Sequence, residues 1–175
     1  SANEWVEQSI PADLFITSAA PGLVNHTPLP GELGAAIAKL PRVEGVEHVR
    51  IADLAFRQAT VKLIATDTAV FSANSRMMMV EGEQREAMRM VAAGSAVIVN
   101  ESFAHHFGLH RGDHLVLPTK RGSVDLRIAG VNVDYLSDRG VVMVDRSVYL
   151  AHFGDTTVDM FKVHTGAHAD LEGLR

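Results

Sequence analysis

An alternation of apolar and polar positions marks the first third of the chain and predicts strands with one buried face. The segment ADLFITS, residues 12–18, is rich in Phe, Ile and Thr. The segment VEHVRIADLAFRQATVKLIATD, residues 46–67, alternates over much of its length, so that Val61, Leu63 and Ala65 share one face. We predict a strand at 12–18 and then two antiparallel strands, with their turn between Gln58 and Thr60.

Between these strands the apolar spacing becomes that of a helix. After Gly31 the apolar residues recur every three or four positions, and Pro41 ends the run because proline cannot continue a helix without losing a backbone hydrogen bond. The apolar positions are Leu33, Ala36, Ile37 and Leu40. A short helix is therefore expected between the first two strand segments.

A strand followed directly by a capped helix is predicted twice in the second half of the chain. In AVIVNESFAHHFG, residues 96–108, an apolar strand leads to Asn100, a residue type that caps helix N-termini, and the helix ends at Gly108. In VVMVDRSVYLAHFG, residues 141–154, Asp145 and Gly154 take the equivalent places. Each segment is expected to form a buried strand and a short helix.

The segments between these units add one more strand and one more helix. MMMVEG, residues 77–82, predicts a short buried strand whose three methionines fill the core and do not form a soft-metal site or an adhesive surface. EQREAMRMVAAG, residues 83–94, predicts a helix with Gly94 at its C-terminal cap.

The remaining apolar segments complete the predicted fold. Strands are expected in GDHLVLPT (112–119), GSVDLRIAGVNVDY (122–135) and TVDMFKVHTG (157–166), and ADLEGLR (169–175) begins a helix. The apolar face changes parity between Ile128 and Val131, which predicts a bulge or kink near Ala129 and Gly130. The elements together predict an α+β fold of mixed and antiparallel sheets with short helices.

Size and composition fit a folded globular chain. The 175 residues are 47% hydrophobic, enough for one domain or for two small subdomains that share a core. A net charge of −5, with 16 Lys and Arg scattered singly, argues against a nucleic-acid partner. The lack of Cys excludes disulfides, a thiolate nucleophile and cysteine metal ligands. No apolar run reaches the roughly 18 residues of a membrane span, and we expect both ends to be cut from a longer chain.

Four histidines lie close together and are candidates for a metal site. They are His105, His106, His110 and His114. The spacing of His106 and His110 would place both imidazoles on one face of a helix, which is half of a zinc site. Gly108 and Gly112 interrupt that helix, however, and no HExxH pattern supplies further ligands. We predict solvated histidines and no bound metal.

The segment DYLSDRG, residues 134–140, is the second candidate for chemistry. Asp134 and Asp138 would be an acid–base pair, supported by Tyr135 and Arg139. A turn rich in Asp, Ser and Gly between two apolar strands accounts for the same residues without any reaction. No GxSxG elbow or phosphate-binding glycine motif is present. We predict no catalytic, cofactor-binding or metal-binding residue.

Four segments, in their order along the chain, resemble the extracytoplasmic domain of FtsX-like ABC transporter permeases, the MacB-like periplasmic core domain. The segments are ANEWVEQSIPADLFITS, LGAAIAKLPRVEGVEHV, GSAVIVNESFAHHFGLHRGDHLVL and AGVNVDYLSDRGVVMVDRSVYLAHFGD. The resemblance runs from about Trp5 to Arg175, and PRVEGVEHV departs from the family's pattern like an insertion.

The resemblance implies structural roles for the positions that match it. Helix caps, turns and strand ends are expected, with Asp134 and Tyr135 finishing a strand and LSDRG crossing to the next one. The eight positions are Asn100, Gly112, Asp113, Gly130, Asp134, Tyr135, Gly140 and Asp145. None of them is a catalytic position in the family.

The resemblance also implies two subdomains in an inner-membrane protein, with this domain on the periplasmic or extracellular side. Residues 1–66 with 155–175 are expected to form a porter-like part of βαβ units whose closing helix and strand are missing. Residues 67–154 are expected to form an inserted, strand-rich part. The domain would transmit ATP-driven movement to extracytoplasmic substrates or partners without being an enzyme itself.

The implied partners are a separate cytoplasmic ABC ATPase, which hydrolyses the ATP, and a second permease copy that completes a dimer. A periplasmic adaptor or a lipoprotein is a further candidate. Two other readings stay open from the sequence. One is a metal-dependent hydrolase that uses the His and Asp clusters, and the other is a free-standing periplasmic binding or adaptor protein.

Overall fold

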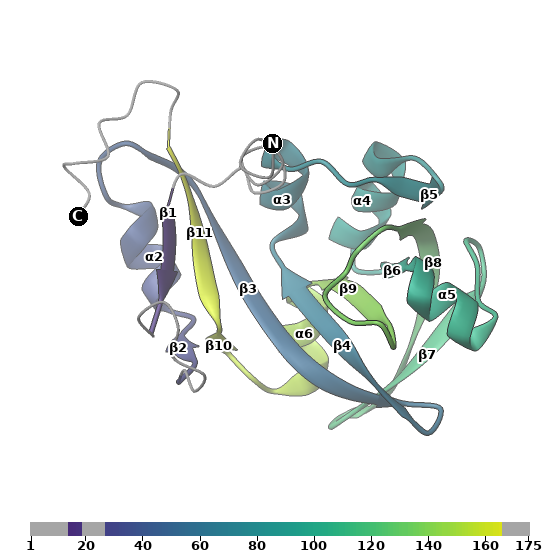
Figure 1. Ribbon diagram of the computed structural model, residues 1–175. Coiled ribbons are helices and arrows are strands. Elements are labelled where there is room, and N and C mark those ends of the chain that lie inside the picture. Colours follow the sequence, from purple (N-terminus) through teal and green to yellow (C-terminus); the bar gives the residue numbers. More distant parts are fainter. Residues whose placement is uncertain (1–13, 19–26, 166–175) are drawn as a thin grey trace.

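The computed structural model describes residues 14–18 and 27–165, and these form one mixed, nine-stranded sheet with helices on both faces (Figure 1). The strand order is β1-β11-β3-β4-β9-β6-β8-β5, and β7 pairs with β8. The strands are β1 Leu14–Thr17, β3 Val43–Phe56, β4 Ala59–Thr66, β5 Met79–Glu81, β6 Ala96–Asn100, β7 His114–Thr119, β8 Gly122–Asn132, β9 Val141–Asp145 and β11 Met160–Thr165. The predicted α+β class with a mixed sheet and short helices is confirmed.

The helices divide between the two faces of the sheet. They are α2 Leu33–Ala38, α3 Thr68–Asn74, α4 Gln84–Ala92, α5 Glu101–Phe107 and α6 Arg146–Phe153. One core cluster joins α5 and α6 to the sheet, and a second joins α4 to the opposite face. Strand β6 separates the two clusters, because Val97 and Val99 belong to the first and Ala96 and Ile98 to the second. Among the described residues, no helix is both long and apolar enough to cross a membrane.

The predicted antiparallel pair of strands is confirmed as the β3–β4 hairpin. Val61, Leu63 and Ala65 are all buried on one face, as their alternation indicates. The turn consists of Arg57 and Gln58, one residue earlier than predicted, and both have positive φ angles of 44° and 64°. Two consecutive positive φ values characterise the tight turn whose twist matches that of the flanking strands.

The predicted bulge is also confirmed. Strands β6 and β8 pair in parallel, and the register steps from Val97 opposite Ile128 to Ile98 opposite Gly130. Ala129 is therefore the extra residue. A Cβ at Gly130 would lie 2.6 Å from Met79 Cε and 2.9 Å from Glu81 O, so only glycine allows β5 to approach this closely.

Three sequence predictions need correction. MMMVEG is not a buried strand, because β5 lies at the sheet edge and the Met78 side chain is 71% exposed. Strand β8 ends at Asn132, so Asp134 and Tyr135 lie in the loop beyond it and do not finish the strand. TVDMFKVHTG forms two strands, β10 Thr157–Val158 and β11, separated at Asp159. Strand β10 pairs with β2 Leu29–Pro30 in a separate two-stranded sheet.

Helix α2 begins and ends within the predicted segment, but Leu33 at its start and Leu40 just after its end are exposed. The helix docks through Gly34, which lies against His48 and Phe161. The predicted helix ADLEGLR lies outside the described residues.

The chain passes twice between the β3–β4 hairpin and the region of β9 and α6, once after β4 and once after α6. Polar side chains fix the chain at both of these crossings. At the first crossing, Asp67 accepts hydrogen bonds from the His48 backbone N–H at 2.7 Å and contacts its Nδ1 at 2.6 Å. Thr68 N–H and Oγ1 donate to the Asp145 carboxylate. The predicted boundaries between the two subdomains, after residues 66 and 154, fall at these crossings. The division into two subdomains itself stays a prediction.

At the second crossing, Arg50 from β3 holds two carboxylates of the segment that leads to β11. Its Nε lies 3.0 Å from Asp155 Oδ2, and its Nη1 lies 3.0 Å from Asp159 Oδ1. Tyr149 Oη donates to Asp155 at 2.5 Å. Asp159 accepts the Ile51 backbone N–H at 2.6 Å, which turns the chain between β10 and β11.

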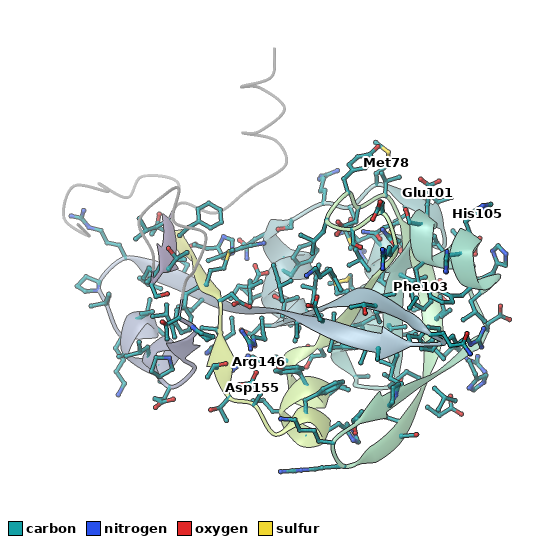
Figure 2. The ribbon with its side chains drawn as sticks, turned by 60° about the horizontal axis from the view of Figure 1, so that its bottom comes forward. Met78, Glu101, Phe103, His105, Arg146 and Asp155 are labelled. Carbon is teal, nitrogen blue, oxygen red and sulfur yellow. The ribbon has the colours of Figure 1, made fainter. Side chains whose placement is uncertain are left out.

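The buried Arg146 supports the same crossing, and Figure 2 shows it beside Asp155. Its Nη2 donates to Thr156 O at 2.8 Å. A Cβ at Gly31 would lie 2.7 Å from that Nη2 and 2.1 Å from Thr156 O, so glycine is needed there. Burial lowers the pKa of Arg146 because a charged guanidinium is poorly solvated inside the protein.

Gly34→Ala is expected to lower the free energy of unfolding by about 1–3 kcal/mol, because the new Cβ would overpack the α2–β3 contact. That Cβ would lie 2.3 Å from His48 Nε2. Helix propensity alone favours Ala over Gly by about 1 kcal/mol. A lower free energy of unfolding would therefore show that overpacking outweighs propensity, and a higher one would show the reverse. Gly45→Ala is the matched control, since its Cβ meets its nearest atom, Val70 Cγ1, at 3.4 Å. Urea unfolding of both variants gives the comparison, and a stabilised Gly34→Ala protein would contradict the described packing.

Asp155→Asn is expected to destabilise the fold at pH 7 by about 1–3 kcal/mol, the usual result of removing a charged hydrogen-bond partner. Burial alone would raise the pKa of Asp155, but hydrogen bonds from Tyr149 and Thr157 and the charge of Arg50 hold it well below the ordinary range. The ionised carboxylate thus stabilises the folded state above its unfolded pKa, near 4, and this contribution is lost as the pH falls toward the folded pKa.

Unfolding measured from pH 7 to pH 2 should therefore show the difference between the two proteins shrinking below about pH 4. Asp53→Asn is the control, because the Asp53–Lys62 pair is exposed and is expected to contribute less than about 1 kcal/mol. A difference for Asp155→Asn that stays constant over this pH range would argue against a depressed pKa.

Candidate functional site

The loop between β8 and β9, residues 133–140, is built around one buried amide side chain. Asn100 Nδ2 donates to Asp134 O at 2.9 Å and to Ser137 O at 3.3 Å. Its Oδ1 accepts from Phe103 N–H at 3.0 Å and Val141 N–H at 2.8 Å. Asn100 therefore caps α5 and fixes both the loop and the start of β9, and its hydrogen-bonding capacity is fully used.

The polar side chains of this loop hold backbone turns. Asp134 Oδ1 accepts the Leu136 N–H at 2.8 Å, and Ser137 Oγ accepts the Arg139 N–H at 3.2 Å. Both side chains therefore stabilise local turns of the loop.

Gly140 closes the loop at a position that only glycine can occupy. Its φ is +141°, and a Cβ there would lie 2.9 Å from Phe103 Cδ2 and 3.0 Å from Phe103 Cβ. Asp145, the matching cap at the other strand–helix junction, accepts the Ser147 N–H at 3.0 Å. Strands β6 and β9 pair antiparallel, so the two junctions lie at opposite ends of this strand pair.

The four clustered histidines point to different partners. Figure 2 shows His105 on the outer side of α5, whereas Phe103 faces the sheet. The His106 ring lies edge-on to Phe107. His110 Nδ1 lies 2.7 Å from Glu81 Oε1, and His114 Nδ1 lies 2.9 Å from Asp125 Oδ1. In the described part of the chain, no group of three or more His, Cys, Asp or Glu is placed to hold a metal ion.

Glu81, at the end of β5, ties this edge strand to the turn that precedes β7. Its Oε2 accepts the Arg111 N–H at 2.8 Å, and this bond, with the one to His110, lowers the pKa of Glu81. The hydrogen bond to Glu81 in turn raises the pKa of His110. In the turn itself, Gly112 N–H donates to Ile128 O at 2.8 Å, and Asp113 Oδ2 accepts the His110 N–H at 2.8 Å.

A buried ionisable cluster on the α3 side of the sheet was not expected from the sequence. Glu47 on β3 is fully buried and accepts a hydrogen bond from Thr66 Oγ1 at 2.7 Å. Lys162 Nζ lies 3.6 Å from Glu47 Oε1, and His164 Nε2 lies 3.5 Å from Oε2. Neither Glu47 Oε2 nor His164 Nε2 makes a hydrogen bond to the described residues. The sequence indicates this cluster only through the position of Glu47, which is two residues before Val49 and therefore on the same, apolar face of the strand.

Exposed apolar side chains gather at the opposite end of the sheet. Met78 directly precedes β5 and Val80 lies within it, and the neighbouring loop carries Tyr135, which is 85% exposed, and Leu136. The loop is joined to this edge because Val133 N–H donates to Met78 O at 2.9 Å. We call Met78, Val80, Tyr135 and Leu136 the β5 patch.

Sequence comparison gives one similar curated protein. The chain is 24% identical over 160 residues to the uncharacterized ABC transporter permease protein Rv0987 of Mycobacterium tuberculosis (strain ATCC 25618 / H37Rv). The match covers 88% of this chain but only 18% of that permease. No protein-family model matches the chain.

The solved structures that share its fold include the following two. The periplasmic region of MacB from Actinobacillus actinomycetemcomitans aligns with a TM-score of 0.63 at 11% identity, over 91% of this chain and 77% of that structure. The extracellular domain of the noncanonic ABC-type transporter YknZ from Gram-positive bacteria aligns with a TM-score of 0.65 at 12% identity, over 91% of this chain and 86% of that structure. This chain therefore has the fold of the MacB periplasmic region and the YknZ extracellular domain, and its sequence is similar to that of an ABC transporter permease, in agreement with the predicted resemblance to FtsX-like, MacB-like ectodomains.

Proposed function

We propose that this chain is the extracytoplasmic domain of an ABC transporter permease and that it transmits ATP-driven movement to substrates or partners outside the cytoplasm. The observation that carries the proposal is the agreement between sequence similarity to a permease and a fold shared with two transporter ectodomains. ATP hydrolysis would belong to a separate cytoplasmic ATPase, and a second permease copy would complete the dimer.

The arrangement of the outermost strands suits a domain attached at one end. Strand β1 pairs antiparallel with β11, so that Leu14 lies opposite Val163. Segments that continue the chain before β1 and after β11 therefore leave from neighbouring strands at the same end of the sheet. A displacement of those segments by membrane helices would act directly on β1, β11 and β3, which pair in that order.

The interior of the domain suits a stiff body. One sheet runs from β1 at one end to β5 at the other, and hydrogen bonds between strands resist stretching along the sheet. In this proposal the porter-like part, 1–66 with 155–175, and the inserted part, 67–154, are joined at the crossings by contacts of His48 with Asp67, of Tyr149 with Asp155, and of Arg146 with Thr156 O. In this proposal those contacts make the two parts move together.

The metal-dependent hydrolase has less support. His110 is engaged by Glu81, and His114 is engaged by Asp125. Asp134 holds a turn of its own loop. A free-standing periplasmic adaptor would use the same fold, and it differs from a permease domain only in what the chain is attached to.

Movement of the domain is tested in the full-length permease with its ATPase. Because this chain contains no Cys, Lys120→Cys supplies a unique label site within it, at the tip of the β7–β8 hairpin. The distance between the spin-labelled copies in a dimer is expected to change by more than about 2 Å, the scale of a domain rearrangement, when the ATPase is trapped in its ATP-bound form.

An internal distance provides the control for the same measurement. Glu44→Cys with Lys120→Cys, diluted with unlabelled protein, reports on the two ends of a single domain and is expected to stay constant. An unchanged distance between copies would contradict the transmission of movement. A change confined to the internal distance would contradict the stiff body.

Metal analysis separates the proposal from the hydrolase reading. The zinc content of the purified 175-residue chain is expected to be far below one ion per molecule and to be the same in His110→Ala, because His110 is paired with Glu81 in the described structure. His114→Ala is the matched control, since His114 has an equivalent carboxylate partner. One zinc ion per chain that is lost specifically in His110→Ala would favour the hydrolase.

A further inference from the structure

The end of the sheet farthest from β1 has an open edge. Among the strands formed by residues 14–18 and 27–165, β5 is the last in the order, and its one strand partner is β8 (Figure 1). An edge strand carries backbone N–H and C=O groups that a further strand can pair with, unless the protein covers or blocks them. The register of β5 shows which of its backbone groups are directed to that open side.

The register directs the backbone of Met79 outward. Met79 lies opposite Asn132, and the Val133 N–H donates to Met78 O at 2.9 Å. In an antiparallel ladder, this pattern identifies Met79 and Asn132 as a non-hydrogen-bonded pair. The N–H and C=O of Met79 therefore point away from β8, to the side where no other described strand follows.

The chain before Met79 closes its own part of the edge. Gln84 Oε1 accepts the Met77 N–H at 2.8 Å, and Gln84 Nε2 donates to Ser75 O at 2.8 Å. The side chain of Gln84 thus occupies the backbone groups of Ser75 and Met77 that a neighbouring strand would otherwise bind. The open stretch is short and is centred on Met79, which limits pairing to a short strand.

The side chains around this stretch supply exposed apolar surface. Met79 packs toward the core cluster beneath α4. Met78 precedes Met79 and is 71% exposed, and Val80, the extra residue where the β5–β8 register shifts, is 50% exposed. Tyr135 and Leu136, both exposed, follow Val133, whose N–H bonds to Met78 O, so they lie close to this edge in the chain. Exposed Met and Tyr are typical of residues at protein contacts.

We propose that β5 binds an extended segment of another polypeptide by strand addition, with the Met79 backbone as hydrogen-bonding partner and the β5 patch as the surface for apolar side chains. Main-chain hydrogen bonds provide much of the affinity in this mode, and alternate side chains provide the selectivity. A folded second copy fits less well, because a stable dimer buries about 800 Å² on each partner through 20–30 residues, and the patch consists of four side chains.

Titration of the ¹⁵N-labelled 175-residue chain with the peptide Ac-Lys-Thr-Val-Thr-Val-Thr-Lys-NH2 tests the proposal. Amide shifts are expected to centre on β5 and on residues 133–136. Hydrogen exchange of the Met79 amide is expected to slow by about tenfold or more near saturation, because a buried hydrogen bond then protects it. The same peptide with Pro in place of its central Thr cannot complete the pairing and should give no protection.

Variants of exposed side chains complete the test without disturbing the core. Met78→Ser and Tyr135→Ser are each expected to weaken peptide binding by about tenfold, as apolar contact residues do. Val116→Ser is the matched control, because Val116 is similarly exposed but lies on β7. Equal weakening by all three variants would overturn the proposal.

The other outcomes also distinguish between occupants of the edge. Binding without protection of the Met79 amide would show apolar adhesion and would overturn strand addition. Met79 protection that appears without peptide and rises with protein concentration would identify a second copy as the occupant. Because the isolated chain is titrated, these results are independent of whether the full-length protein is a permease.

Discussion

The parallel pairing of β4 with β9 is the contact on which the rest of the structure depends. Its register, from Lys62 opposite Val141 to Thr66 opposite Asp145, joins the β3–β4 hairpin to the strands β6, β8 and β5. Parallel neighbours need a long connection, and the intervening segment 67–140 forms α3, α4, α5 and the strands at the far end of the sheet. Polar contacts at the two crossings fix the chain where it enters and leaves this region.

Those contacts are ionic or charge-assisted, so their geometry is specific. Arg50 engages both Asp155 and Asp159, and Arg146 holds the carbonyl of Thr156. An apolar contact at the same place would tolerate sliding, whereas a charged group in a partly buried site loses much of its stabilisation when its partner moves. This specificity is consistent with a domain that is proposed to move as one body.

Local chemistry accounts for the parts of the structure that the sequence predicted. The turn at Arg57 and Gln58 and the caps at Asn100 and Asp145 are decided by residues within a few positions of each other. The parity change at Ala129 was visible because strand side chains alternate strictly. The turn character of loop 133–140 was also readable, although the fourfold role of Asn100 depends on Val141, which is distant in sequence.

Contacts between distant segments account for what the sequence did not reveal. The burial of Glu47 beside His164, the pairing of His110 with Glu81 and the exposure of Met78 all follow from which strands become neighbours. MMMVEG has the composition of a core strand, but the strand order places it at an edge. Periodicity indicates which face of a strand is apolar, and it does not indicate whether another element covers that face.

The pairing of β1 with β11 has a consequence for how the domain reaches this state. These two strands come from nearly opposite ends of the described chain, yet β11 lies between β1 and β3. The β3–β4 hairpin can form early, whereas β1 has no strand to pair with until β11 has been made and exported or released. Sheets with such distant pairings fold slowly and expose unpaired edges meanwhile. The N-terminal strand can therefore join the sheet only after nearly the whole described chain has been synthesised.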